Sequence, residues 1–200
     1  MIKNQIKIVC LGDSITKGRF SYNWVKQLSD EFKGKNIRFF NLGKNRELAF
    51  NALNRVDKII PIQPDYIIIL LGTNDVFATL RKENTKRYIR LEKLPRQPTI
   101  EWYVENIGKI INHLKTNTSA KIAIITLPII GEDLNNIANK TVDKYNTELT
   151  NLSKQNELGC LDMNQKMIEF LDQLDPINPV PLQNYRSLIL KSIWRKYFLF

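Results

Sequence analysis

Short runs of apolar residues alternate along this chain with longer stretches in which apolar residues recur every three or four positions. The short runs are rich in Ile, Val, Leu and Phe, which is typical of strands buried inside a sheet. The pattern predicts strands over residues 7–11, 37–41, 66–71, 122–126 and 159–162.

The longer stretches have the period of amphipathic helices. Helices are predicted over residues 21–32, 47–60, 99–115, 136–155 and about 182–197. Thr99 is a suitable N-cap for the third. The last is expected to pack its apolar residues on the sheet, with a membrane-touching or acyl-chain-facing tail as the alternative.

Strands that alternate with helices predict an α/β fold with parallel crossovers and helices on both faces of one sheet. The length of 200 residues suits a single domain, and the sequence contains no internal repeat, low-complexity tract or linker. The longest segment predicted to be irregular is 77–98. It follows the third strand, where an active-site lid would lie, so we expect a lid-like insertion there.

The net charge of +10 is unevenly distributed, and residues 81–96 carry half of it. The basic residues of this segment are Arg81, Lys82, Lys86, Arg87, Arg90, Lys93 and Arg96, against Glu83 and Glu92. A charge run of this kind is typical of a solvated surface. The alternative is attraction to an acidic polymer, a lipid head group or nucleic acid. The sequence contains no specific nucleic-acid motif.

Other bulk features restrict the class of protein further. The two cysteines, Cys10 and Cys160, both lie in apolar runs and are expected to be buried and reduced. No apolar stretch is long enough to cross a bilayer, and the N-terminus lacks a signal core. We therefore expect a cytoplasmic protein, or a mature chain from which a leader was removed. The absence of a metal-ligand cluster and of a phosphate-binding glycine loop predicts that no cofactor is used.

Polar residues that carry chemistry follow several of the predicted strands. Ser14 comes after the first strand and Asn74 after the third. Because ligands of open α/β sheets bind outside the carboxyl ends of the strands, these residues lie where a site is expected. A serine in this position is more often an N-cap than a nucleophile, and Asn74 suits a turn as well as an oxyanion donor. The functional interpretation needs partners for both.

Four blocks supply candidate partners. They are Gly12-Asp13-Ser14, Asn41-Leu42-Gly43-Lys44-Asn45-Arg46-Glu47, Gly72-Thr73-Asn74-Asp75 and Asp175-Pro176-Ile177-Asn178-Pro179. Together and in this order they resemble the SGNH (GDSL-type) serine ester hydrolases over nearly the whole chain. The resemblance implies a three-layer α/β/α fold with five parallel strands in the flavodoxin-like order 2-1-3-4-5. It also implies an ester or acylated small-molecule substrate.

The resemblance assigns catalytic roles to matching positions. Ser14 takes the nucleophile position and Asp175 the acid position of the triad, and Ser14, Arg46 and Asn74 occupy the oxyanion-hole positions. Two residues depart from the family pattern. Arg46 replaces a glycine whose main-chain N–H donates to the oxyanion, which matters if the turn requires a positive φ. Arg46 also brings a cation that suits a carboxylate or phosphate on a substrate.

Asn178 stands where the family has its catalytic histidine. An asparagine amide has no useful basicity, so it cannot take the Ser14 proton. The only histidine, His113, is predicted at the end of a helix that faces the opposite edge of the sheet. A serine–lysine arrangement through Lys17 or Lys44 would require that lysine to be desolvated.

Three classes of function therefore follow from the sequence. The first is an SGNH-type ester hydrolase with low activity, and the second is a pseudoenzyme that binds an ester, acyl or glycan ligand without turnover. The third is a basic scaffold protein that binds an anionic partner. Ser14, Asn74 and Asp175 favour the first two.

Overall fold

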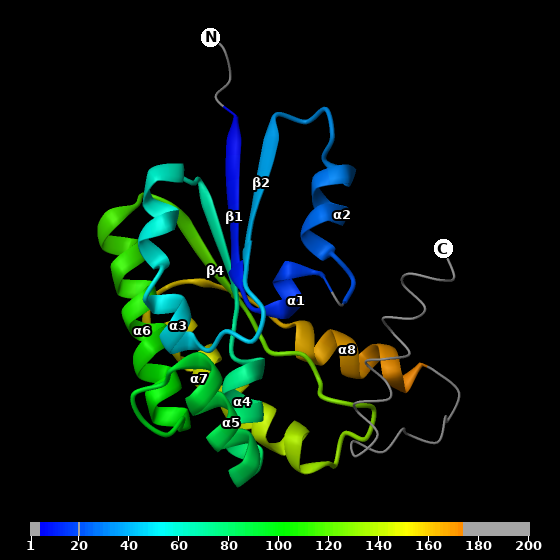
Figure 1. Cartoon of the computed structure of the whole chain (residues 1–200). Helices are drawn as coiled ribbons and strands as arrows, with labels where there is room; N and C mark the ends of the chain where they lie inside the picture. Colours follow the sequence, from blue (N-terminus) through cyan, green and yellow to red (C-terminus); the bar gives the residue numbers. More distant parts are fainter. Residues whose placement is uncertain (1–4, 20, 174–200) are drawn as a thin grey trace.

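The computed structural model describes residues 5–19 and 21–173, which form one five-stranded parallel sheet flanked by helices (Figure 1). Its strands are β1 (Ile6–Gly12), β2 (Ile37–Gly43), β3 (Tyr66–Leu70), β4 (Lys121–Ile125) and β5 (Gly159–Leu161). The strand order is β2-β1-β3-β4-β5 and every pairing is parallel, so the predicted fold class and order are confirmed. All five predicted strands are present, with ends that differ by at most two residues.

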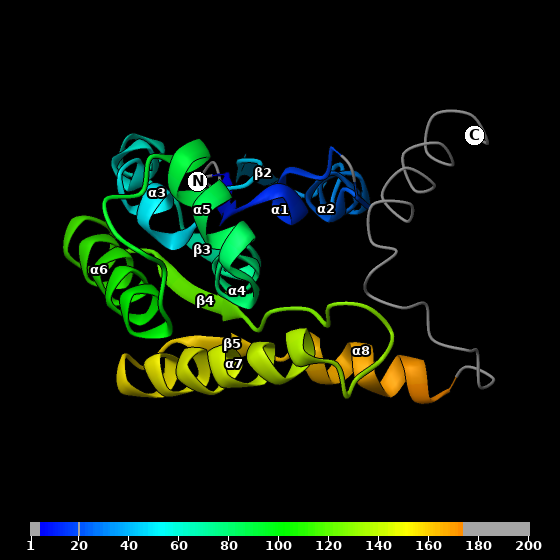
Figure 2. The same cartoon turned by 60° about the horizontal axis from the view of Figure 1, so that its bottom comes forward.

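Nine helical segments connect or flank the strands in the described residues. They are α1 (Ser14–Lys17), α2 (Trp24–Glu31), α3 (Ala49–Leu53), the 3₁₀ helix η1 (Val56–Ile62), α4 (Thr73–Leu80), α5 (Lys82–Glu92), α6 (Ile100–Asn117), α7 (Ile137–Gln155) and α8 (Met163–Asp172). In Figures 1 and 2, α1 and α2 lie on one side of the sheet and α3 and α6 on the other. The layered arrangement is therefore as predicted.

The main core lies on the sheet face that α3, α6 and α7 cover. Alternate residues of the strands point into it, because side chains of a strand alternate between the two faces. Its fully buried members include Val9 and Leu11 of β1, Ile69 of β3, Ile107 of α6 and Val142 of α7. Each such aliphatic side chain contributes roughly 1.5–3 kcal/mol when buried. This core keeps the strands in register.

The register places the ends of three strands side by side. Gly12 pairs with Gly43 of β2 and with Leu70 of β3. The segments that follow these strands, which begin at Asp13, Lys44 and Leu71, therefore leave the sheet from one edge. All the candidate blocks in the described residues begin at this edge.

Two of the predicted helices are close to the observed ones. Thr99 caps α6 as expected, and its Oγ1 accepts from the Trp102 N–H at 3.2 Å. Asn136 caps α7 in the same way through the Asn139 N–H at 2.8 Å. The first predicted helix begins three residues later than expected, at Trp24, because the Asn23 side chain caps it. The predicted helix over 182–197 lies outside the described residues.

Three predictions about local structure were wrong. Segment 77–98 is mostly helical, in α4 and α5, and not irregular. The predicted helix over 47–60 is split into α3 and η1, and η1 continues through Pro61 because a 3₁₀ turn tolerates it near its end. Cys160 is exposed, because it lies in β5, a three-residue strand at the sheet edge whose residues are all exposed. Cys10 is buried as expected, and burial raises the pKa of its thiol to about 12.

Candidate active site

The turn after β1 places Ser14 at the first position of α1. Asp13 caps this helix, and its Oδ1 accepts from the Ile15 N–H at 2.9 Å. Ser14 itself is half-buried. Gly12 is required before the turn, because a Cβ there would lie 2.1 Å from Thr16 Oγ1 and 2.4 Å from the Leu70 carbonyl oxygen. The tight strand-to-helix turn thus depends on the Gly-Asp-Ser order.

The segment after β2 is fastened to the same turn. The Asn41 side chain accepts from the Gly43 N–H at 2.9 Å and donates to the Thr16 carbonyl at 2.7 Å. The Lys44 N–H donates to the Gly12 carbonyl at 3.0 Å. Because these bonds join main chain to main chain or to a short amide side chain, the second block is held firmly against α1.

Arg46 adopts the left-handed conformation that the family's glycine would take easily. Its φ is 64°, and it is one of four non-glycine residues with positive φ in the described chain. The side chain is 57% exposed, and Nε lies 3.9 Å from Glu92 Oε1 of α5. The cation that the sequence places at the site is therefore turned toward a carboxylate of α5.

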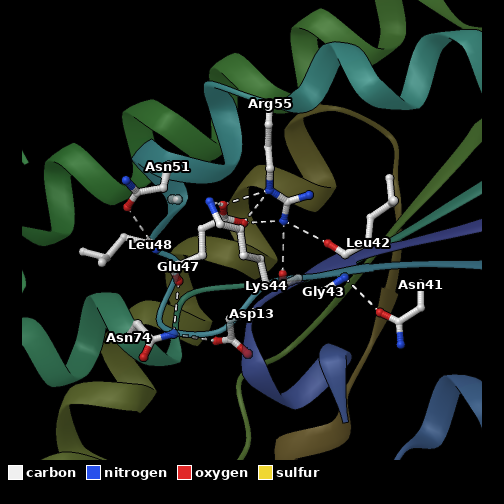
Figure 3. Close-up of polar contacts among 12 residues, drawn as sticks. Asp13, Asn41, Leu42, Gly43, Lys44, Glu47, Leu48, Asn51, Arg55 and Asn74 are labelled. Carbon is white, nitrogen blue, oxygen red and sulfur yellow. Dashed lines mark hydrogen bonds and ion pairs between the residues drawn. The ribbon is translucent and has the colours of Figure 1, made fainter. Parts of the chain in front are cut away.

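A buried ion pair lies directly beside this turn (Figure 3). Glu47 has no exposed surface, and Arg55 donates through Nε to both of its carboxylate oxygens, at 2.8 and 2.7 Å. Arg55 Nη2 donates to Glu47 as well, and to the carbonyl of Leu42 at 2.8 Å and of Gly12 at 3.3 Å. The pair therefore links the ends of β1 and β2 to the second block.

Asn74 joins the third block to the first two. It is the second residue of α4, which follows Gly72, a glycine with a φ of 137° that packs against the Tyr103 ring. Asn74 Nδ2 donates to the Glu47 carbonyl at 3.1 Å and to Asp13 Oδ2 at 3.3 Å, and Oδ1 accepts from the Tyr88 hydroxyl at 2.8 Å. Only 7% of the residue is exposed.

The candidate site contains two buried carboxyl groups, those of Asp13 and Asp75. Burial raises the pKa of Asp13 to about 7, although the hydrogen bond from the Ile15 N–H acts in the opposite direction. Burial also raises the pKa of Asp75 well above its usual range, while the Ala49 N–H, which donates to both of its oxygens, lowers it. A carboxyl group that shares its surroundings with other acids and little water retains its proton more readily.

The structure places Asn74 in contact with the sequence neighbours of Ser14 and Arg46, two other residues that the resemblance selected. Asn74 contacts Asp13, the residue before Ser14, and Glu47, the residue after Arg46. Asp175 and Asn178 lie outside the described residues, so their placement stays a prediction.

The alternative bases suggested by the sequence are not placed for that role. His113 Nε2 lies 2.7 Å from Asp57 of η1, which precedes β3 and so lies at the opposite edge of the sheet from Ser14. Lys17 is exposed, and the side chain of Lys44 is 64% exposed, with Nζ 3.4 Å from Glu47 Oε1. Neither lysine has the desolvated environment that a neutral amine requires.

Sequence reasoning missed two parts of this site. The Glu47–Arg55 pair had little signal, because the stretch predicted as one helix also contains a second acidic and a second basic residue, Asp57 and Lys58. Tyr88 had none, because nothing in the sequence relates a tyrosine of the basic segment to Asn74 fourteen positions before it. In the described part of the chain, no group of three or more His, Cys, Asp or Glu residues is arranged to hold a metal ion.

The comparisons with known proteins agree with this geometry. A family model described as GDSL-like lipase/acylhydrolase matches residues 10–180. The chain belongs to this family. As a GDSL-like protein it carries the Gly12-Asp13-Ser14 turn at the expected strand end, and membership makes it a relative of carboxylic ester hydrolases.

Solved structures share the fold of this GDSL-like chain. The acetylxylan esterase Axe2 from Geobacillus stearothermophilus is 18% identical, with a TM-score of 0.71 over 98% of this chain and 95% of that chain. LAE5, an alpha/beta hydrolase from the metagenome of Lake Arreo in Spain, is 17% identical, with a TM-score of 0.70 over 96% of each chain. No curated protein matches the sequence. Among the described residues, no helix is both long and apolar enough to span a bilayer.

Proposed function

We propose that this chain is an SGNH-type serine ester hydrolase that acts through Ser14 and whose catalytic triad is impaired at Asn178. The observation that supports the proposal most strongly is the contact between Asn74 and the Asp13–Ser14 turn. In this contact a side-chain N–H donor from the segment after β3 meets Asp13, the residue before the serine. A serine nucleophile and a convergent donor are the minimum that acyl transfer requires.

In this proposal the Ser14 hydroxyl attacks the ester carbonyl and forms an acyl-enzyme, which water then hydrolyses. The oxyanion receives hydrogen bonds from the main-chain N–H groups of Ser14 and Arg46 and from Asn74 Nδ2. Both N–H groups of Asn74 are already used, for the Glu47 carbonyl at 3.1 Å and for Asp13 at 3.3 Å. The longer bond, to Asp13, is the one that we expect the oxyanion to replace.

The weak point of the proposed triad is its base. Asp175 would normally orient a histidine, and Asn178 offers no basic nitrogen to be oriented. Loss of such a base costs on the order of 10⁶ in kcat in a serine protease. An oxyanion hole and substrate binding alone retain about 10³–10⁴ over the reaction in water. We therefore propose slow turnover by the natural sequence.

Small esters and acetylated sugars are the substrates to examine first. The structural neighbours include an acetylxylan esterase, and a half-buried Ser14 in a short turn suits a small acyl group. The proposed experiment compares the natural chain, Asn178→His, Asn178→Gln and Ser14→Ala/Asn178→His on p-nitrophenyl acetate and on acetylated xylo-oligosaccharide.

Asn178→His is expected to raise kcat by orders of magnitude, because it supplies the missing base. Asn178→Gln, which restores no base, is expected to stay at the natural rate, and Ser14→Ala is expected to abolish the gain. If Asn178→His remains at the rate of buffer alone while the protein stays folded, hydrolysis is excluded. Ligand binding without turnover is then the better proposal.

A second proposed function rests on the outer face of α5. Lys82, Lys86, Arg90 and Lys93 are spaced three or four residues apart and are all exposed. Within the described chain no acidic side chain forms an ion pair with any of them. Such a stripe suits an anionic polymer.

The binding of a sulfated polysaccharide matrix tests this second function. We expect retention that falls steeply with added salt, because exposed charges are screened over about 8–10 Å at physiological ionic strength. Lys86→Glu/Arg90→Glu is expected to lose retention, whereas Lys140→Glu/Lys144→Glu on α7 is the matched control. Retention that ignores both salt and the α5 charges would rule this function out.

A further inference from the structure

We infer that Tyr88 is a positioning residue for Asn74: its hydroxyl holds the Asn74 amide with the donor end turned toward the Asp13–Ser14 turn. This inference rests on the proposed function, in which that donor end serves the oxyanion. It adds a residue from α5 to a site that the sequence blocks build only from the ends of β1, β2 and β3.

The three contacts of the Asn74 amide fix its orientation. The Tyr88 hydroxyl donates to Oδ1 at 2.8 Å, whereas Nδ2 faces two acceptors, Asp13 Oδ2 and the Glu47 carbonyl. If the amide were turned over, Oδ1 would face these two oxygen atoms, and Nδ2 would face Tyr88. Of the two orientations, only the observed one pairs every donor with an acceptor, and only this one presents an N–H to the site.

Tyr88 also affects the strength of the donor. A hydrogen bond to the carbonyl oxygen of an amide polarises the group and strengthens the bonds that its N–H groups donate, and the effect is larger where water is excluded. Asn74 is 7% exposed, so this condition holds. We therefore expect Tyr88 to influence kcat rather than substrate affinity, since the oxyanion develops only in the transition state.

The simpler alternative is that Tyr88 only fastens α5 to the domain. Two other residues of α5 do this: Asn84 Nδ2 donates to the Phe77 carbonyl at 3.0 Å, and Thr85 Oγ1 to the Ala78 carbonyl at 2.7 Å. The Tyr88 ring also packs against the small core cluster that contains Leu48 and Trp102. A test must therefore remove the Tyr88 hydroxyl and retain the ring. The result must be compared with the loss of a hydrogen bond that only attaches α5 to the domain.

The kinetic test uses Tyr88→Phe in the Asn178→His protein. We expect kcat on p-nitrophenyl acetate to fall about tenfold with little change in KM, which is the size of one ordinary hydrogen bond lost in the transition state. Thr85→Val is the matched control: it removes the hydrogen bond to the Ala78 carbonyl, which attaches α5, and is expected to leave kcat unchanged. In an Asn74→Ala background, Tyr88→Phe is expected to cause no further loss, because the two residues act through one donor.

A measurement that needs no catalysis accompanies the kinetics. The side-chain amide resonances of Asn74, assigned by their loss in Asn74→Ala, are followed by ¹⁵N NMR. Tyr88→Phe is expected to shift them and to speed their exchange with water, whereas Thr85→Val is not. An inactive Asn178→His protein would count against the proposed function alone, and the NMR result would then decide the positioning role. Unchanged Asn74 resonances, or equal losses of kcat in both backgrounds, would overturn the inference.

Discussion

Arg55 and Glu47 form a fork-shaped ion pair inside the candidate active site, with Arg55 Nε 2.8 and 2.7 Å from the two carboxylate oxygens. The side chain of Glu47 is completely buried and that of Arg55 is 13% exposed. The same guanidinium donates to the carbonyls of Gly12 and Leu42. It therefore supports the main chain at the ends of β1 and β2, beside the Ser14 turn, while it neutralises a buried carboxylate.

Arg55→Met is expected to destabilise the protein by about 3–5 kcal/mol, because it leaves the Glu47 charge buried without its main partner. Urea unfolding measures the change. Arg55→Met/Glu47→Leu removes both charges and is expected to recover part of the loss, since an apolar pair of similar volume avoids the desolvation cost. A loss below about 1 kcal/mol in the single variant would mean that water or Lys44 compensates the carboxylate.

Gly12→Ala tests whether the nucleophile turn tolerates a side chain. The added Cβ would lie 2.4 Å from the Leu70 carbonyl oxygen, which is main chain of the neighbouring strand and cannot move without disturbing the sheet. Overpacking of this kind typically costs about 1–3 kcal/mol or more, and here it also displaces Ser14. We expect a lower midpoint of thermal unfolding together with loss of any Ser14-dependent activity.

Gly108→Ala is the matched control for that experiment. Gly108 lies inside α6, and a Cβ there would meet no atom within 4 Å. Because glycine inside a helix costs roughly 0.5–1 kcal/mol relative to alanine, this variant is expected to be more stable than the natural chain. Equal melting temperatures for Gly12→Ala and Gly108→Ala would show that the turn has more room than the structure indicates.

The fold was largely predictable because its buried strands are short, continuous apolar runs that are easily recognised in the sequence. A run such as Tyr66–Leu70 is apolar throughout, and strand-helix alternation leaves few possible topologies. The helix α5 was not predictable in the same way. It contains no fully buried residue, and its attachment depends on polar side chains such as Asn84 and Thr85. Only Tyr88, Ile89 and Leu91 of its eleven residues are apolar, too few to show a helical repeat in the sequence.

The residues of the candidate site likewise differ in how far the sequence alone could reveal them. Ser14 and Asn74 could be proposed as site residues from the sequence because they belong to short blocks at the ends of strands. The sequence indicated that Arg46 would matter if its turn required a positive φ, but it could not show that the turn does. The backbone conformation depends on the contacts of the whole turn. Glu47 pairs with Arg55 eight residues later, and Tyr88 contacts Asn74 fourteen residues before it. Spacing alone does not reveal these pairings, because they depend on how the turns between the residues fold.

Arg46→Gly is expected to stabilise the protein by about 1 kcal/mol, because glycine adopts the left-handed region without the cost that other residues bear there. Loss of the contact with Glu92 subtracts little, since the Arg46 side chain is 57% exposed and the atoms are 3.9 Å apart. Arg46→Ala separates the two effects: it removes the guanidinium, retains the strain and is expected to give no gain. Urea unfolding of the three proteins is the measurement, and equal stabilities of the Gly and Ala variants would show that φ is not strained.

The raised pKa of Asp13 predicts a particular dependence of stability on pH. Burial places this pKa at about 7 in the folded chain, whereas an unfolded aspartate titrates near 4. Between these two values the folded state binds the proton and the unfolded state releases it. The contribution of Asp13 to the free energy of unfolding is therefore greatest below pH 4 and is lost as the pH rises to 7, by at most about 1.4 kcal/mol per pH unit.

Asp13→Asn isolates this contribution, because the amide oxygen still accepts from the Ile15 N–H and the helix remains capped. We expect the free energy of unfolding of the natural chain, measured in urea from pH 4 to 8, to fall more steeply than that of Asp13→Asn up to about pH 7. Above that pH the two slopes are expected to be equal. Asp75 is present in both proteins, and its pKa is raised mainly by burial; only the smaller part that the Asp13 charge adds differs between them. Parallel curves over the whole range would mean that Asp13 is ionised in the folded protein, with its charge balanced by the N–H groups of Ile15 and Asn74.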